Sequence, residues 1–99
     1  MEFAVPYAYR DIAIFILDNE PIGDVRPGMA LAAARRAWRL AEEQDPVVAE
    51  VLCRALLVNG EKEEAAAIAK AAIAQLDEGA FGPEDLHRRL ESHLEASRK

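Results

Sequence analysis

The chain has 99 residues, of which 52% are hydrophobic and 30% charged, and its formal net charge at pH 7 is −6. This length suits one domain with a modest core, and this composition excludes a disordered chain. A negative surface repels phosphate, so we expect neither nucleic acid nor an anionic membrane as a partner. The single cysteine, Cys53, excludes an internal disulfide.

The start of the chain carries no targeting pattern. It lacks a basic n-region, and the apolar run at residues 12–17 is far too short to cross a bilayer. We therefore expect a soluble protein that inserts into no membrane and is cytoplasmic by default.

The first predicted element covers about residues 6–19, because Pro6 suits a helix start and Pro21 disfavours helix in the residue before it. Isoleucines at every second position leave a strand open as an alternative. A helical pattern of apolar residues at i, i+3, i+4, i+7 and i+8 fits equally well. Its members are Tyr9, Ile12, Ala13, Ile16 and Leu17.

Four further helices are predicted between Pro and Gly breakers. Asp45 is expected to be the N-cap of the third helix, with Pro46 at its first position. Acidic residues at the start of the fourth helix suit the positive end of the helix dipole. A leucine stripe marks the fifth helix as amphipathic. The expected ranges are about 29–44, 46–58, 61–78 and 83–97.

An internal repeat favours helix for the first segment as well. The first and third segments match at an offset of 39 residues, which places Ile12 on Val51 and Phe15 on Arg54. The second and fourth segments match at an offset of 35 residues. Two repeating helical hairpins are typical of a solenoid. The sequence therefore predicts an all-α fold of five helices: two antiparallel helical hairpins stacked as a short right-handed α-solenoid, plus a capping helix.

Each predicted hairpin carries three alanines at i, i+4 and i+7 of its second helix. Such small side chains let two helices lie close together. A large residue follows the third alanine, Trp38 in one hairpin and Ile73 in the other, and is expected to fill the space towards the next helix. The alanines are Ala30, Ala34 and Ala37 in the first hairpin and Ala65, Ala69 and Ala72 in the second.

The segment LLVNGEKEEAAAIAKAAI resembles the turn and second helix of the tetratricopeptide repeat family, and AEEQDP is similar to the family's junction between repeats. The resemblance implies one domain, 1–99, with repeat 1 at about 7–44, repeat 2 at about 46–78 and a capping helix at about 83–97. The family's large aromatic pair is missing from VVAEVLCRALLV. The whole chain also resembles small helical-repeat modules appended to larger bacterial proteins, including some with thioredoxin-like domains.

No residue pattern predicts catalysis, a cofactor or a metal site. His87 and His93 are six positions apart, whereas metal-binding pairs on a helix are three or four apart. Cys53 has no histidine in local reach and is expected to be a small, half-buried side chain. Phosphate-binding loops and nucleophile motifs are absent. We therefore expect a protein that is not an enzyme.

The first helix is apolar almost all round, so it must be covered on more than one side. Two interpretations stay open for Ile14 and Phe15. Either the N-terminal tail folds back over them, or they meet a second copy or another domain.

The leading hypothesis is a non-catalytic protein–protein interaction module that binds a peptide, a helix or a partner domain. The resemblance implies binding on the concave face, lined by the first helix of each hairpin. Its mixed acidic and apolar character suits a ligand with basic and aliphatic residues. The alternative is a structural dimerisation or packing domain of a larger protein, with a possible homo-oligomer through the first helix. The expected partner-binding residues are Asp11, Ile14, Phe15, Asp18, Asn19, Glu50, Arg54, Leu57 and Val58.

Overall fold

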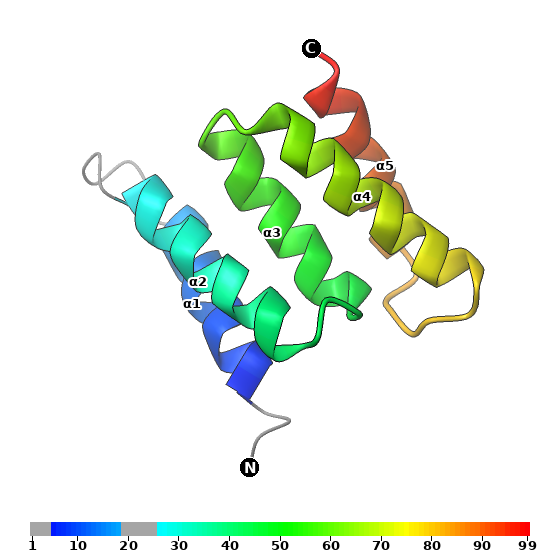
Figure 1. Ribbon diagram of the computed structural model, residues 1–99, viewed down its shortest axis with the longest axis horizontal. Helices are drawn as coiled ribbons and strands as arrows, with labels where there is room; N and C mark the ends of the chain where they lie inside the picture. Colours follow the sequence, from blue (N-terminus) through cyan, green and yellow to red (C-terminus); the bar gives the residue numbers. More distant parts are fainter. Residues whose placement is uncertain (1–4, 19–25) are drawn as a thin grey trace.

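The computed structural model describes residues 5–18 and 26–99, which form five helices and no strand (Figure 1). The predicted all-α fold is therefore confirmed, and the strand interpretation of the first segment is wrong. None of the described helices is long and apolar enough to cross a membrane. The helices are α1 (Val5–Asp18), α2 (Arg26–Leu40), α3 (Pro46–Val58), α4 (Lys62–Asp77) and α5 (Leu86–Ser97).

Helix α3 lies at the centre and contacts the other four helices. Helix α1 also packs on α2, and α4 also packs on α5. In Figure 1, α1 lies behind α2 and α5 lies behind α4. The backbones of α2 and α4 make no direct contact within the described residues. Helix α3 therefore lies between the α1–α2 pair and the α4–α5 pair.

The ends of α3 follow from local sequence as predicted. The Asp45 carboxylate accepts a hydrogen bond from the Val47 backbone N–H at 2.9 Å, and the Tyr7 hydroxyl of α1 donates to the same carboxylate at 2.8 Å. This N-cap therefore also joins the first hairpin to the second. At the other end, Gly60 adopts φ +78°, which suits glycine and lets the chain turn into α4.

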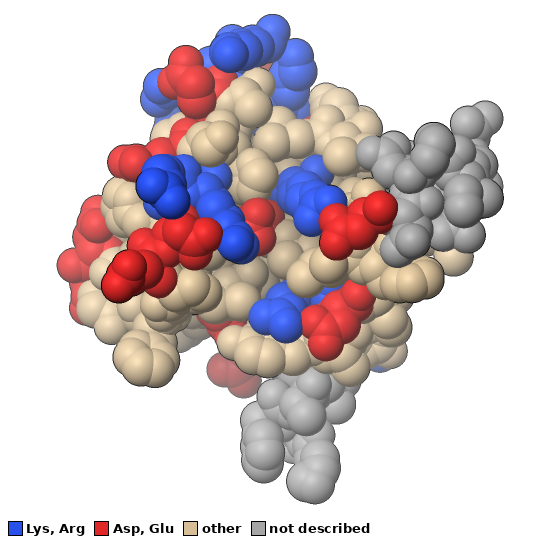
Figure 2. Space-filling model, turned by 180° about the vertical axis from the view of Figure 1, so that it is seen from behind, with Lys and Arg blue, Asp and Glu red and all other residues tan. Residues whose placement is uncertain are grey.

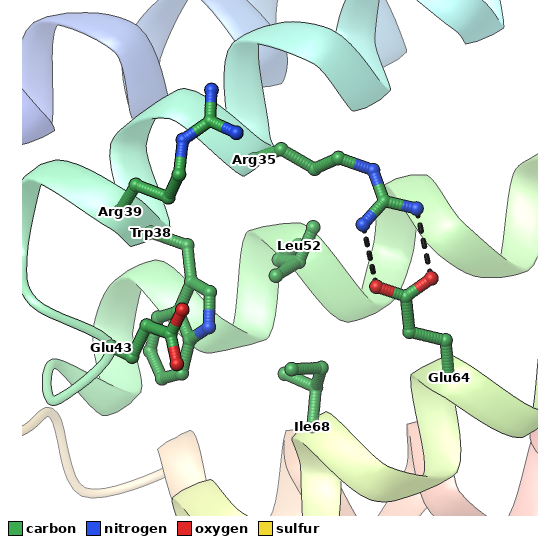
Figure 3. A pocket seen from close by; sticks show the side chains of 7 residues that line it. All are labelled: Arg35, Trp38, Arg39, Glu43, Leu52, Glu64 and Ile68. Carbon is green, nitrogen blue, oxygen red and sulfur yellow. Dashed lines mark hydrogen bonds and ion pairs between the residues drawn. The ribbon is translucent and has the colours of Figure 1, made fainter.

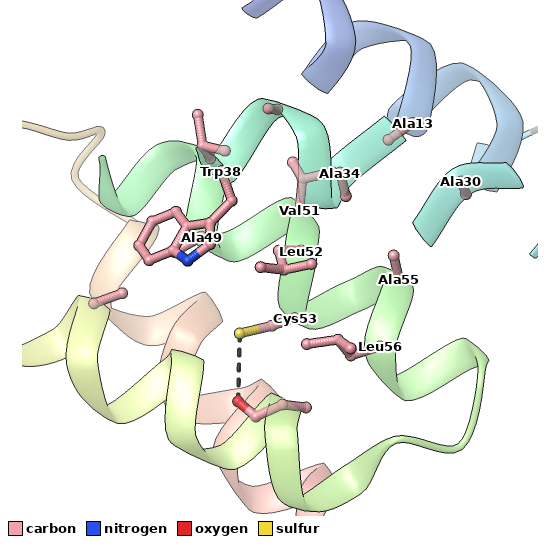
Figure 4. Close-up of a cluster of buried hydrophobic side chains, with 14 of the residues drawn as sticks. Ala13, Ala30, Ala34, Trp38, Ala49, Val51, Leu52, Cys53, Ala55 and Leu56 are labelled. Atoms are coloured by element: carbon pink, nitrogen blue, oxygen red, sulfur yellow. Dashed lines mark hydrogen bonds between the residues drawn. The ribbon is translucent and has the colours of Figure 1, made fainter. Parts of the chain in front are cut away.

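The interior of the molecule is built from the predicted alanines and from larger side chains of α3 and α5. Figure 4 shows the part of this core where Ala30, Ala34 and Trp38 of α2 lie near the α3 side chains. All six alanines are buried, and Trp38 is buried against the same core. The leucines of α5 point inwards as predicted, with Leu86 and Leu90 fully enclosed and Leu94 at the edge of the core. Small side chains between helices permit close packing at interior density.

The predicted inner face of α1 needs one correction. Ala13, Ile16 and Leu17 are buried, and Tyr9 and Ile14 pack on the core from its margin. Ile12, expected inside, is 48% exposed. Helices α2 and α3 are the described helices that contact α1, and together they leave about half of the Ile12 side chain exposed.

Candidate functional site

Helix α3 presents a single stripe to solvent, because its other eight residues are buried. We call these five residues the α3 stripe. It lies between α1 and α5, which both contact α3. All four α3 residues that the sequence predicted for binding belong to this stripe. Its members are Val47, Glu50, Arg54, Leu57 and Val58.

Both charged residues of the α3 stripe are engaged within the chain. The Arg54 guanidinium pairs with the Asp18 carboxylate of α1. The Glu50 carboxylate lies 2.8 Å from Nε2 of His93 on α5, and both of these side chains are mostly buried. These two contacts therefore connect the α3 stripe to α1 and to α5. The resemblance implies that Asp18, Glu50 and Arg54 share one face, whereas the sequence gives no signal for His93, which lies 43 positions from Glu50.

The other predicted residues lie around this stripe. Phe15 is 63% exposed, whereas Ile14 is half-buried against the core and so is mostly packed inside the chain. Asp11 is exposed and pairs with its neighbour Arg10 at 2.8 Å, so it is not drawn into the α1–α3 ion pair. Asn19 lies outside the described residues. Figure 2 shows the face on which α1 and α5 lie, where acidic and basic side chains alternate with uncharged surface.

A pocket of about 330 Å³ lies on the opposite side, between α2 and α4 (Figure 3). Leu52 of α3 contributes to its lining, and the indole of Trp38 and the side chain of Ile68 extend into the space between the two helices. Sequence analysis expected Trp38 to fill space between the hairpins but did not predict a pocket beside it. The lining residues are Arg35, Trp38, Arg39, Glu43, Leu52, Glu64 and Ile68.

Two polar contacts join the walls of this pocket. Arg35 of α2 donates two hydrogen bonds to the Glu64 carboxylate of α4, at 2.5 and 2.8 Å. These bonds lower the pKa of the Glu64 carboxyl and raise that of the Arg35 guanidinium. Gln75 of α4 donates to the Glu43 carbonyl at 3.1 Å, where Glu43 adopts φ +59°. The pocket is therefore part of the interface between the two hairpins. The sequence features that indicate this contact between the hairpins are the arginines of α2 and the acidic residues at the start of α4.

Two kinds of reactive site can be checked directly in the described residues, a metal-binding cluster and a reactive thiol. They contain no group of three or more His, Cys, Asp or Glu side chains arranged to hold a metal ion. Cys53 is fully buried rather than half-buried as expected, and its thiol lies 3.5 Å from the Ala65 carbonyl oxygen. Burial, and then the charge of Glu50, raise the pKa of this thiol to about 12. A thiol in this state is a poor nucleophile, because the reactive form is the thiolate.

No protein-family model, no curated protein and no solved structure matches this chain.

Proposed function

We propose that this chain is a non-catalytic interaction module that binds a short peptide or helix along the face formed by α1, α3 and α5. The observation that carries the proposal is the α3 stripe. The central helix of the molecule is covered on every side but one, and that side combines acidic, basic and aliphatic groups. Such a mixed surface suits recognition of a peptide by side-chain contacts.

The order of helix contacts supports a tetratricopeptide-like arrangement. Helices α1, α3 and α5 contact in series, while α2 contacts α1 and α3, and α4 contacts α3 and α5. In the tetratricopeptide repeat family the first helix of each hairpin lines the binding face. In this chain those helices are α1 and α3, which carry the proposed binding residues.

The charges of this face favour a ligand with basic and aliphatic side chains. Asp18 keeps about half of its side chain exposed while it pairs with Arg54, and Asp11 is more exposed still. An exposed ion pair contributes only about 0–1 kcal/mol, so a ligand's Lys or Arg can displace Arg54 at small cost. Exposed Val58 and half-buried Leu57 then offer apolar contact nearby. With so short a face, we expect micromolar affinity.

Two synthetic peptides of equal length test this proposal. One combines Leu with Lys and Arg, the other combines Leu with Glu, and both carry a fluorescent label for anisotropy. The full chain is expected to bind the basic peptide and not the acidic one. Val58→Lys should weaken binding by roughly tenfold, because it adds a positive charge and removes an apolar contact at the stripe.

Ala71→Lys is the matched control. Ala71 is exposed on α4, so this variant changes the net charge equally but leaves the α3 stripe intact. Equal weakening by both variants would show that only the overall charge attracts the peptide. Equal weakening, or no binding of the basic peptide at all, would reject the proposal.

A further inference from the structure

The pocket between α2 and α4 contains a hydrogen-bond donor that no described residue satisfies. Trp38 is only 7% exposed, so most of its side chain has lost contact with water. Its indole N–H can only donate, and it has no acceptor within residues 5–18 and 26–99. In Figure 3 the indole nitrogen lies on the edge of the ring that faces Leu52 and Ile68. The pocket therefore presents this donor to a ligand that carries an acceptor.

Four charged side chains line the pocket, and two of them pair with each other. Arg35 and Glu64 share two hydrogen bonds that join α2 to α4. The Arg39 guanidinium and the Glu43 carboxylate have no ion-pair partner within the part of the chain that the structure describes. Both side chains are exposed at the rim of the pocket. The pocket thus offers one unpaired positive group and one unpaired negative group.

Apolar side chains line the space between these charges. Leu52 of α3 is 1% exposed, and Ile68 of α4 packs on the core. Figure 3 shows both side chains between Trp38 and the Arg35–Glu64 pair. The volume of about 330 Å³ is near the lower end of the range for small-molecule sites, about 300–1,000 Å³. The pocket therefore suits a small ligand with a compact apolar part.

We propose that this pocket binds a free α-amino acid with an apolar side chain. The ligand's carboxylate accepts the Trp38 N–H and pairs with Arg39, because a carboxylate only accepts and both of these groups only donate. Its ammonium group pairs with Glu43. Its side chain covers Leu52 and Ile68. A zwitterion complements both unpaired charges, whereas a simple anion or cation complements one of them.

Binding of this ligand would add contacts between the two hairpins. Helix α2 belongs to the first hairpin and α4 to the second, and both contribute to the walls of the pocket. A ligand that binds only the folded chain stabilises it, so the amino acid should raise the midpoint of thermal unfolding. The inference does not depend on peptide binding at the α3 stripe, because the pocket lies on another side of the molecule.

Leucine and two of its analogues test this inference. Trp38 is the only tryptophan of the chain, so its fluorescence reports directly on the pocket. Isocaproate lacks the ammonium group of leucine, and isoamylamine lacks the carboxylate. Titration of the full chain up to about 10 mM ligand should give a saturable change with leucine and at least roughly tenfold weaker binding with each analogue. Glutamate should also bind weakly, because its second carboxylate would meet apolar side chains.

Two variants remove the unpaired charges one at a time. Arg39→Gln and Glu43→Gln should each weaken leucine binding roughly tenfold with unchanged helical circular dichroism, since both side chains are exposed. Arg36→Gln is the matched control. Arg36 is exposed on the same helix but does not line the pocket, so this variant should bind leucine like the unchanged chain.

Trp38→Phe tests the indole donor and is followed by calorimetry, because the variant lacks the fluorescent group. It should weaken leucine binding, and Arg39→Gln decides the question alone if Trp38→Phe loses helical structure. The absence of both a fluorescence change and a thermal shift with leucine overturns the inference. Isocaproate or isoamylamine that binds as tightly as leucine also overturns it, and so does equal weakening by Arg36→Gln and Arg39→Gln.

Discussion

Cys53 illustrates at the scale of one residue how packing determines chemistry. It corresponds to Ile14 of α1 in the internal repeat and occupies an interior position beside α4. Because α4 closes over it, the side chain acts as a small apolar group, and its raised pKa follows from the loss of water. The same position in α1 is only half-buried, because α1 has fewer neighbours.

We predict that Cys53 resists thiol reagents in the native protein. A thiol with a pKa of about 12 is almost fully protonated at pH 8. Reaction with a chromogenic disulfide reagent should be complete in denaturant and very slow without it. A native reaction as fast as that of the denatured chain would contradict the described burial.

The raised thiol pKa also gives the sign of a pH effect on stability. The unfolded thiol ionises near pH 9, whereas the folded one stays protonated up to about 12. The free energy of unfolding should therefore fall as the pH rises through this interval. Cys53→Ala, which removes the ionisable group, should show less of this alkaline loss when the two proteins are compared by thermal unfolding.

At the scale of helices, the alanine spacing determines how closely two helices approach. Ala69→Leu adds three carbons to a fully buried side chain of α4, so we predict a loss of about 1–3 kcal/mol in unfolding free energy. Ala71→Leu, on the exposed side of the same helix, is the control and should cost little. Urea titrations of both variants provide the measurement. Equal stabilities would contradict the packing described for Ala69.

Sequence analysis predicted the helices and the alanine contacts well, because both depend on local periodicity and breakers. The boundaries were less accurate. Helix α2 begins at Arg26 rather than near residue 29, and α5 begins at Leu86 rather than near residue 83. A proline is tolerated in the first turn of a helix, so Pro27 need not precede α2.

Sequence periodicity could not predict which surface residues of different helices contact each other. Periodicity predicts Ile12 on an inner face, but it cannot tell that α2 and α3 are the only described helices that contact α1. The Arg35–Glu64 and Glu50–His93 contacts join residues 29 and 43 positions apart. Such pairs depend on how the hairpins stack, which the repeat offsets predict only in outline. Four of the five residues of the α3 stripe were expected to share one face, because the resemblance to tetratricopeptide repeats implies that the first helix of each hairpin lines a surface.

At the scale of the whole molecule, the α3 stripe and the pocket are separate surfaces. The α3 stripe lies between α1 and α5, whereas the pocket lies between α2 and α4. A peptide bound along the α3 stripe therefore leaves the pocket accessible.

The central claim is that ligands bind along the α3 stripe. The most direct test is a titration of the isotope-labelled chain with the basic Leu/Lys/Arg peptide, followed through its backbone amide NMR shifts. We predict that the largest changes occur at Glu50, Arg54, Leu57 and Val58 and at the facing turns of α1 and α5. Changes centred instead on Trp38 and Ile68 in the pocket between α2 and α4, or no changes at all, would contradict the claim.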